Sequence, residues 1–110
     1  PGMKHRHYAP KANMEFFTEW EDVQWADDEK IWVITIDLCP PNDIPDGMQW
    51  HDFEGNFVRM AHELYALLRS ADEEGVNQIL VQQYPWDELD ALQVALKNRL
   101  DKAVSKGDRS

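Results

Sequence analysis

The residues best suited to binding chemistry lie near the start of the chain. Met3–Lys11 reads Met-Lys-His-Arg-His-Tyr-Ala-Pro-Lys, so basic side chains alternate with imidazoles and a phenol. Cations beside aromatic rings contact phosphates and stack on nucleobases. The longer stretch Pro1–Asn13 has two prolines and no apolar periodicity, which predicts an extended arm. Its composition alone also fits a basic tail without a ligand.

The sequence gives weaker support for metal binding or nucleophilic catalysis by its histidines and cysteine. His5 and His7 form a His-x-His pair, but the surrounding cations disfavour a divalent metal. The lone cysteine, Cys39, can form neither an internal disulfide nor a zinc site by itself, and we expect it to be a small buried residue. His51 and His62 flank the start of a predicted helix, where surface or capping roles are expected.

No sequence motif for catalysis accompanies these residues. The sequence contains no nucleophile elbow, phosphate loop, Gly-x-Gly-x-x-Gly turn or zinc spacing. The acidic triplets 27–29 and 72–74 are expected to be solvated faces, since runs of like charge usually are. We therefore expect no catalytic residue, no metal site, no cofactor and no turnover in this chain alone.

Apolar spacing predicts the strands that must position these residues. Met14–Trp20 predicts a short strand, and the β-branched run Ile31–Ile36 predicts a strand covered on both faces. Val76–Gln82 predicts another buried strand. Glu21–Lys30 fits either a helical turn or a loop. Met48–Phe53 fits either an extended piece or the lead-in to a helix.

Two helices are predicted from three- and four-residue apolar steps. The first runs over Phe57–Ala71, with Asn56 as its N-cap and Gly75 as its stop. The second is expected to begin with Asp87 as its cap. Its apolar face would consist of Leu89, Leu92, Leu96, Leu100 and Ala103. Apolar strands alternating with helices predict an α/β fold, with the helices packed on a small, mostly parallel sheet.

Composition limits the class of protein. The chain has 110 residues, room for one domain, and 43% of them are hydrophobic, enough to form a core. Residues 1–12 and 91–110 each carry +3, so residues 13–90 must carry −16 to give the net charge of −10. This charge argues against direct RNA contact by the acidic body. No stretch resembles a membrane span or signal peptide, which predicts a cytoplasmic protein without membrane contact.

A resemblance adds to these patterns. The segment PGMKHRHYAPKA resembles the interdomain linker of the two-domain, long form of threonylcarbamoyl-AMP synthase. Further along, LYALLRSADEEGVNQILV and ALQVALKNRLDKAV are similar to the C-terminal domain of the same family. Residues 13–53 do not align with it, and Ala91-Leu92-Gln93 stands where that family has a glycine-rich helix opening. A start inside a Pro-Gly turn favours a piece of a longer polypeptide over loss of an initiator methionine.

The resemblance implies a small Rossmann-like, three-layer α/β domain with its sheet flanked by helices. The division would be a linker over 1–13 and an accessory domain over 14–110. Its partner in cis would be a YrdC-type catalytic domain, a nucleotidyltransferase that uses ATP, Mg²⁺, L-threonine and bicarbonate to make threonylcarbamoyl-AMP for tRNA modification. By position, Lys4, Arg6, His7 and Tyr8 would lie near the nucleotide and gate that site.

A second hypothesis comes from the tryptophans. Trp20, Trp25, Trp32, Trp50 and Trp86 are many for a chain of this length, and aromatic residues anchor protein interfaces when they are exposed. The alternative function is therefore a free-standing acidic interaction module with a tryptophan-rich docking surface. A small nucleotide-binding enzyme is a third possibility, weakened by the missing phosphate loop.

Overall fold

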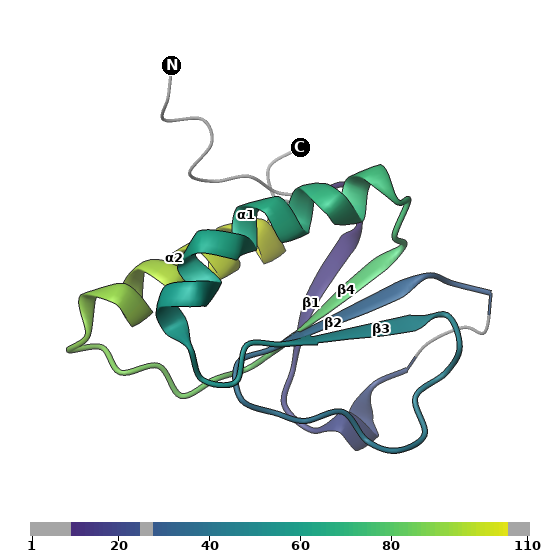
Figure 1. Cartoon of the computed structure of the whole chain (residues 1–110), viewed down its shortest axis with the longest axis horizontal. Helices are drawn as coiled ribbons and strands as arrows, with labels where there is room; N and C mark the ends of the chain where they lie inside the picture. The colour runs from purple at the N-terminus through teal and green to yellow at the C-terminus, as the bar shows by residue number, and fades with distance from the viewer. Residues whose placement is uncertain (1–9, 25–27, 106–110) are drawn as a thin grey trace.

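The computed structural model describes residues 10–24 and 28–105. It contains a four-stranded, entirely parallel sheet with the strand order β1-β4-β2-β3 (Figure 1). This confirms the predicted α/β class. In chain order the elements are β1 (Asn13–Phe17), the 3-10 turn η2 (Trp20–Asp22), β2 (Ile31–Thr35), β3 (Met48–Asp52), α1 (Phe57–Glu73), β4 (Gln78–Gln82) and α2 (Ala91–Val104).

The two central strands follow directly from their sequences. All five residues of β2 are buried, as are the three middle residues of β4. Such continuous apolar runs are typical of parallel strands covered on both faces. The expected strands at both places are therefore confirmed, and β4 begins two residues later than predicted.

β3 settles the segment that the sequence left open. Met48–Asp52 is a strand at the edge of the sheet, paired with β2. Met48 is buried, while Gln49 is exposed and the next three residues are half-buried. Such a strand lacks both a continuous apolar run and a strict alternation, so its pattern could not distinguish extended structure from the lead-in to a helix.

Helix α1 agrees with its prediction at both ends. The Asn56 side chain accepts a hydrogen bond from the Arg59 amide, which satisfies one free donor of the first turn. Gly75 has a φ of 70°, a conformation that ends the helix and that glycine adopts without strain. The buried face consists of Met60, Leu64, Leu68 and Ala71.

Helix α2 begins later than predicted. Its N-cap is Asp90, whose side chain accepts from the Leu92 amide, so the assignment of Asp87 as the cap is wrong. Asp87 instead accepts from the amide of Leu89, and its own amide donates to the Gln93 side chain. Leu89 lies outside the helix and is 96% exposed, so it does not belong to the apolar face. Leu96, Leu100 and Ala103 are buried as expected.

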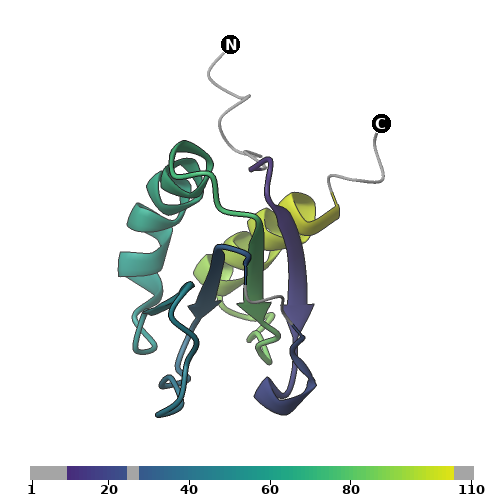
Figure 2. The ribbon, with the colours of Figure 1, turned by 90° about the vertical axis from the view of Figure 1, so that its right-hand side faces the viewer.

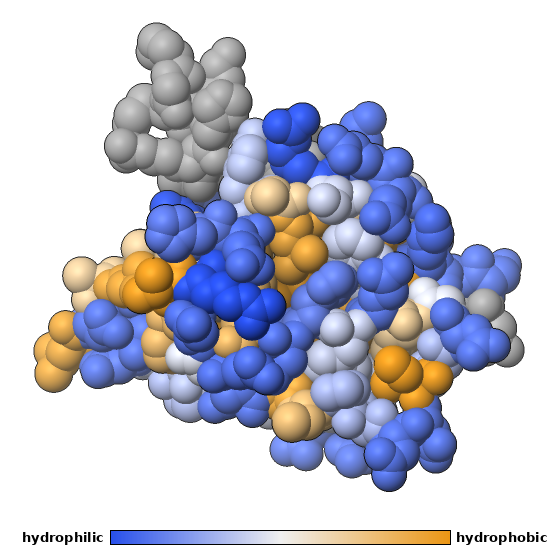
Figure 3. All heavy atoms as spheres, in the orientation of Figure 1, coloured by the Kyte–Doolittle hydropathy of each residue, from blue (hydrophilic) through white to orange (hydrophobic). Residues whose placement is uncertain are grey.

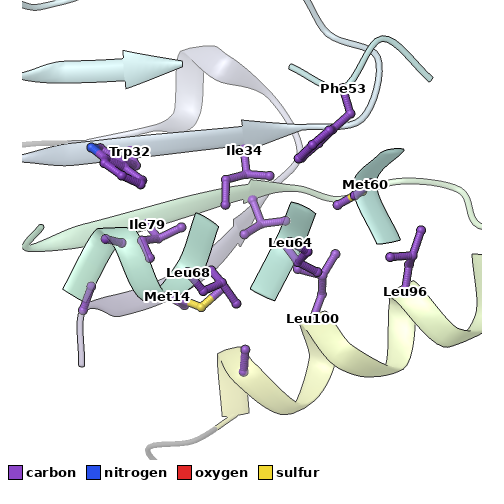
Figure 4. Packing of buried hydrophobic residues seen from close by; sticks show 14 of the residues in the cluster. Met14, Trp32, Ile34, Phe53, Met60, Leu64, Leu68, Ile79, Leu96 and Leu100 are labelled. Carbon is purple, nitrogen blue, oxygen red and sulfur yellow. The ribbon is translucent and has the colours of Figure 1, made fainter. Parts of the chain in front are cut away.

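The two faces of the sheet are covered differently. Both helices lie on one side (Figures 1 and 2), where their buried side chains form the larger core with β2, β4 and β1 (Figure 4). The opposite face packs against η2 and loop residues rather than a helix. Its core consists of Phe17, Ile31, Val33, Met48 and Leu80 with Trp20, Val23, Leu38, Ile44 and Trp50 against them. The third layer is therefore made of a turn and loops.

The ends of the folded unit lie close together. The beginning of β1 and the end of α2 are at the same end of the molecule in both views (Figures 1 and 2). Helix α2 contacts β1 directly.

In the described residues, neither helix has the length and apolar character needed to cross a bilayer.

Candidate functional site: the anchor of the arm and the carboxyl edge of the sheet

The predicted site residues Lys4, Arg6, His7 and Tyr8 lie outside the described residues, and so do His5 and Met3. Their roles stay predictions. The structure does show how the chain that follows them is held. The expected boundary after residue 13 also stays a prediction, although packing against the domain already begins at Pro10.

The junction between the arm and the sheet is fixed by several contacts. Pro10 is fully buried and Ala12 is 5% exposed. Between them, the Lys11 amide donates to Asp72 Oδ1 at 2.7 Å, near the C-terminal end of α1. Two residues later the Asn13 amide donates to the Asn77 carbonyl at 3.1 Å. The arm therefore leaves the domain from a defined point, held to α1 and to the turn after it.

A first polar cluster lies at the carboxyl edge of the sheet. The Thr35 hydroxyl is 2.8 Å from Asp52 Oδ1, and this oxygen also accepts from the Leu38 amide at 3.0 Å. The Trp50 indole N–H donates to the Thr35 hydroxyl at 3.1 Å and to the Leu38 carbonyl at 3.0 Å. Because Thr35 is buried, these contacts satisfy its polar group and hold the end of β2 against β3.

A second cluster joins the ends of β2 and β4. The Gln82 side-chain oxygen accepts from the amides of Ile36 at 2.7 Å and Asp37 at 3.3 Å. Its side-chain nitrogen donates to the Asp37 carboxylate at 3.1 Å. Burial raises the pKa of the Tyr84 hydroxyl, and the negative charge and hydrogen bond of Asp37 raise this pKa further. The Tyr84 hydroxyl is therefore a neutral donor to Asp37 at neutral pH.

Each cluster includes an aromatic side chain that packs on other rings. Phe57, Tyr84 and Trp86 contact one another with ring centroids 5.1 to 6.3 Å apart. On the other face, Trp50 packs against Trp20 at 5.0 Å. Trp32 is buried in its strand, as expected. Trp25 lies outside the described residues, and the tryptophan-rich docking surface stays a prediction.

The remaining sequence candidates are spread over the surface and the core. Cys39 is exposed, so the expectation that it is buried was wrong; the loop after β2 carries it outward. His62 is exposed on α1, as expected of a surface position. His51 is not on a helix or at a cap: it is a half-buried residue of β3.

The acidic triplets have local roles where they are described. Asp72 holds the arm junction, Glu73 lies 3.9 Å from Arg69, and Glu74 is the C-cap residue of α1. Asp28 is exposed and Asp27 lies outside the described residues. Within the described ranges, no group of three or more histidine, cysteine, aspartate or glutamate residues could hold a metal ion.

The comparison with protein families covers both the arm and the folded unit. A family model described as threonylcarbamoyl-AMP synthase, C-terminal domain, matches residues 1–105. The chain belongs to this family. It matches no curated protein and no solved structure in the same comparisons. As a C-terminal domain of the synthase, it is expected to follow a catalytic domain in the same polypeptide.

Sequence reasoning missed the residues that build the carboxyl edge and the anchor of this synthase domain. Asp37, Asp52 and Gln82 each stand at or just after the end of a strand, which is where parallel sheets gather polar groups. That signal was present in the sequence. Asp72 could not be assigned to the arm junction, because its partner lies 61 positions away along the chain.

Proposed function

We propose that this domain is a non-catalytic accessory domain that holds the arm over the nucleotide site of the synthase catalytic domain. The observation that carries the proposal is the fixed junction at Pro10, Lys11 and Asp72, together with a family match that runs through the arm. A cover attached to a fixed point returns to the same place after each turnover, whereas a free tail does not.

The chemistry of the arm fits this role. Lys4 and Arg6 would neutralise phosphate charge, and His7 and Tyr8 would lie against the nucleotide or its intermediate. Threonylcarbamoyl-AMP is a mixed anhydride, so excluding water protects it from hydrolysis. ATP, Mg²⁺, L-threonine and bicarbonate would bind in the catalytic domain, and this domain would supply the cover.

The test adds the chain to a separately expressed catalytic domain of the family. We expect tighter ATP binding by titration calorimetry and slower release of threonylcarbamoyl-AMP. Loss of one charge-assisted contact costs about 1.5 kcal/mol or more, so Arg6→Ala should weaken ATP binding by the pair about tenfold. If the catalytic domain bound ATP and released threonylcarbamoyl-AMP equally with and without the chain, the proposal would be contradicted.

The anchor has its own matched pair of variants. Asp72→Ala removes the acceptor for the Lys11 amide, whereas Glu73→Ala removes only an exposed carboxylate 3.9 Å from Arg69. We expect Asp72→Ala to speed release of the intermediate and Glu73→Ala to leave it unchanged. If the catalytic domain released threonylcarbamoyl-AMP at the same rate with either variant as with the unmodified chain, the anchor would have no part in covering the site.

A further inference from the structure

A groove runs between the outer edge of β3 and helix α1. It encloses about 220 Å³ and is lined by residues 50–53 on one side and by Arg59, Glu63 and Leu67 of α1 on the other. One wall is thus a stretch of strand and its exit, and the other is a helix face. This arrangement leaves room for an extended chain beside β3.

The main chain of β3 offers hydrogen bonds to such a chain. Among the described strands, β3 pairs with β2 alone, at the edge of the sheet. The Phe53 amide donates to the Thr35 carbonyl of β2 at 3.0 Å. Since main-chain groups alternate between the two edges of a strand, those of Trp50 and Asp52 face away from the sheet. These two residues are the template for an added strand.

A buried polar atom lies beside the same groove. His51 Nε2 is buried without a hydrogen-bond partner in the described part of the chain, and so is Trp32 Nε1. The two rings pack with centroids 4.7 Å apart. An unpaired buried polar group costs roughly 1–3 kcal/mol. A hydrogen bond between a guest side chain and Nε2 of this groove-lining imidazole would remove that cost. Burial lowers the pKa of His51, partly opposed by the Glu74 carboxylate, which leaves the imidazole neutral at pH 7.

The groove is lined by one cation and two carboxylates. Arg59 lies 3.4 Å from Glu63, and its guanidinium sits 5.1 Å from the centre of the Phe53 ring. One oxygen of the Asp52 carboxylate, Oδ1, accepts from Thr35 and Leu38 in the polar cluster described above. With Arg59 against Asp52 and Glu63, the lining carries a formal charge of −1, which disfavours an acidic guest. The neutral imidazole favours a guest side chain that can hydrogen-bond.

We propose that an extended segment of the synthase catalytic domain adds as a strand to the free edge of β3 and places a Ser, Thr, Asn or Gln side chain against His51 Nε2. This rests on the proposed function, since it requires a catalytic domain acting with this one. Two residues of strand edge and one side-chain pocket give a weak contact. A domain tethered in the same polypeptide has a millimolar effective concentration, which is sufficient for such a contact.

The experiment follows main-chain amides of the ¹⁵N-labelled chain during titration with the separately expressed catalytic domain. We expect the Trp50 and Asp52 amides to gain protection from hydrogen exchange, with shift changes over residues 50–53 and along the groove face of α1. Protection elsewhere only, or concentration-dependent protection of β3 in the chain alone, would overturn the proposal. The second result would assign the edge to self-association.

Two variants separate binding from folding. Glu63→Trp fills the groove from α1 and should weaken binding of the catalytic domain at least tenfold, while His62→Trp places the same ring one position away and should not. His51→Phe keeps a ring but removes the unpaired nitrogen, so binding should weaken without a loss of stability. If all three variants bound the catalytic domain equally well, the groove would not be the docking site.

Failure of this proposal can be told from failure of the proposed function. The arm variant Arg6→Ala reports on nucleotide binding without touching the groove. If Arg6→Ala weakens ATP binding by the pair while the β3 amides gain no protection, the arm covers the nucleotide site and the strand addition is wrong.

Discussion

At the scale of single residues, three properties of His51 on the edge strand β3 act together. Its Nε2 atom is buried and unpaired, its ring packs on Trp32, and its pKa is lowered by burial. An imidazole held in this way is costly to protonate. The residue therefore links the stability of the fold to pH.

The first prediction follows from that link. The unfolded chain binds a proton on His51 near the ordinary pKa of 6.5, whereas the folded state binds it only at lower pH. Stability should therefore fall as the pH drops below about 6.5. Urea unfolding of the His51→Phe variant should show a shallower loss between pH 7 and 5, with His62→Gln, at an exposed position, as the control. Parallel profiles for His51→Phe and the unmodified chain would assign the pH dependence to other groups.

Gly47 gives a second residue-scale prediction. A Cβ atom at this position would lie 2.9 Å from the Glu29 carbonyl oxygen, closer than van der Waals contact allows. Both partners are backbone, so relief requires moving the loop that leads into β2 or the one that leads into β3. Gly47→Ala should lower the free energy of unfolding by about 1–3 kcal/mol, while Asp46→Ala should have a much smaller effect. Equal unfolding midpoints for the two variants would show that the loops adjust freely.

At the scale of elements, the start of α2 shows how two similar aspartates play different parts. Asp90 caps the helix, and Asp87 organises the turn before it. Asp90→Ala should cost about 1 kcal/mol, measured by urea unfolding. Asp87→Ala should cost less, because it removes a turn contact to the exposed Leu89 rather than a helix cap. The reverse order of midpoints would mean that the helix is initiated at Asp87.

The same helix shows where sequence reasoning reaches its limit. Both aspartates precede apolar residues at helical spacing, and Leu89 extends the apolar stripe by one step. Nothing local distinguishes the two possible starts, because the choice depends on packing of α2 against β1 and α1. Helix α1 and strand β2 could be predicted, since a strong periodicity or a continuous apolar run leaves no competing assignment.

The polar contacts were harder to predict than the elements. Asp37 meets Gln82 across 45 positions, and Lys11 meets Asp72 across 61. Such pairs depend on strand order, which periodicity does not specify. The groove beside β3 depends on strand order too. Among the described strands, β3 stands last in the order and has β2 as its one neighbour, which leaves its other edge free.

At the scale of the whole molecule, the two faces of the sheet should differ in stability. One face is covered by two helices and the other by η2 and loops. Surfaces covered by loops open more easily than surfaces covered by packed helices. We expect the loop-covered face to open as a unit before the molecule unfolds.

Native-state hydrogen exchange in low concentrations of urea measures this difference. Amides of residues 20–23, 38–39 and 42–44 should exchange through a partial opening, while those of Ile79 and Val81 should exchange only through global unfolding. Trp20→Ala should speed exchange on the loop-covered face alone. Leu96→Ala, in the helix layer, should lower the protection of amides on both faces of the sheet. A single opening free energy across all amides would contradict two separate layers.

The closeness of the two ends of the fold has a consequence for engineering. Because β1 begins and α2 ends at the same end of the molecule, the domain can be grafted into a surface loop of an unrelated host without stretching either partner. For the same reason, a short bridge could join the two ends while new termini are opened in the exposed turn at residues 87–89, giving a circularly permuted chain with the same core.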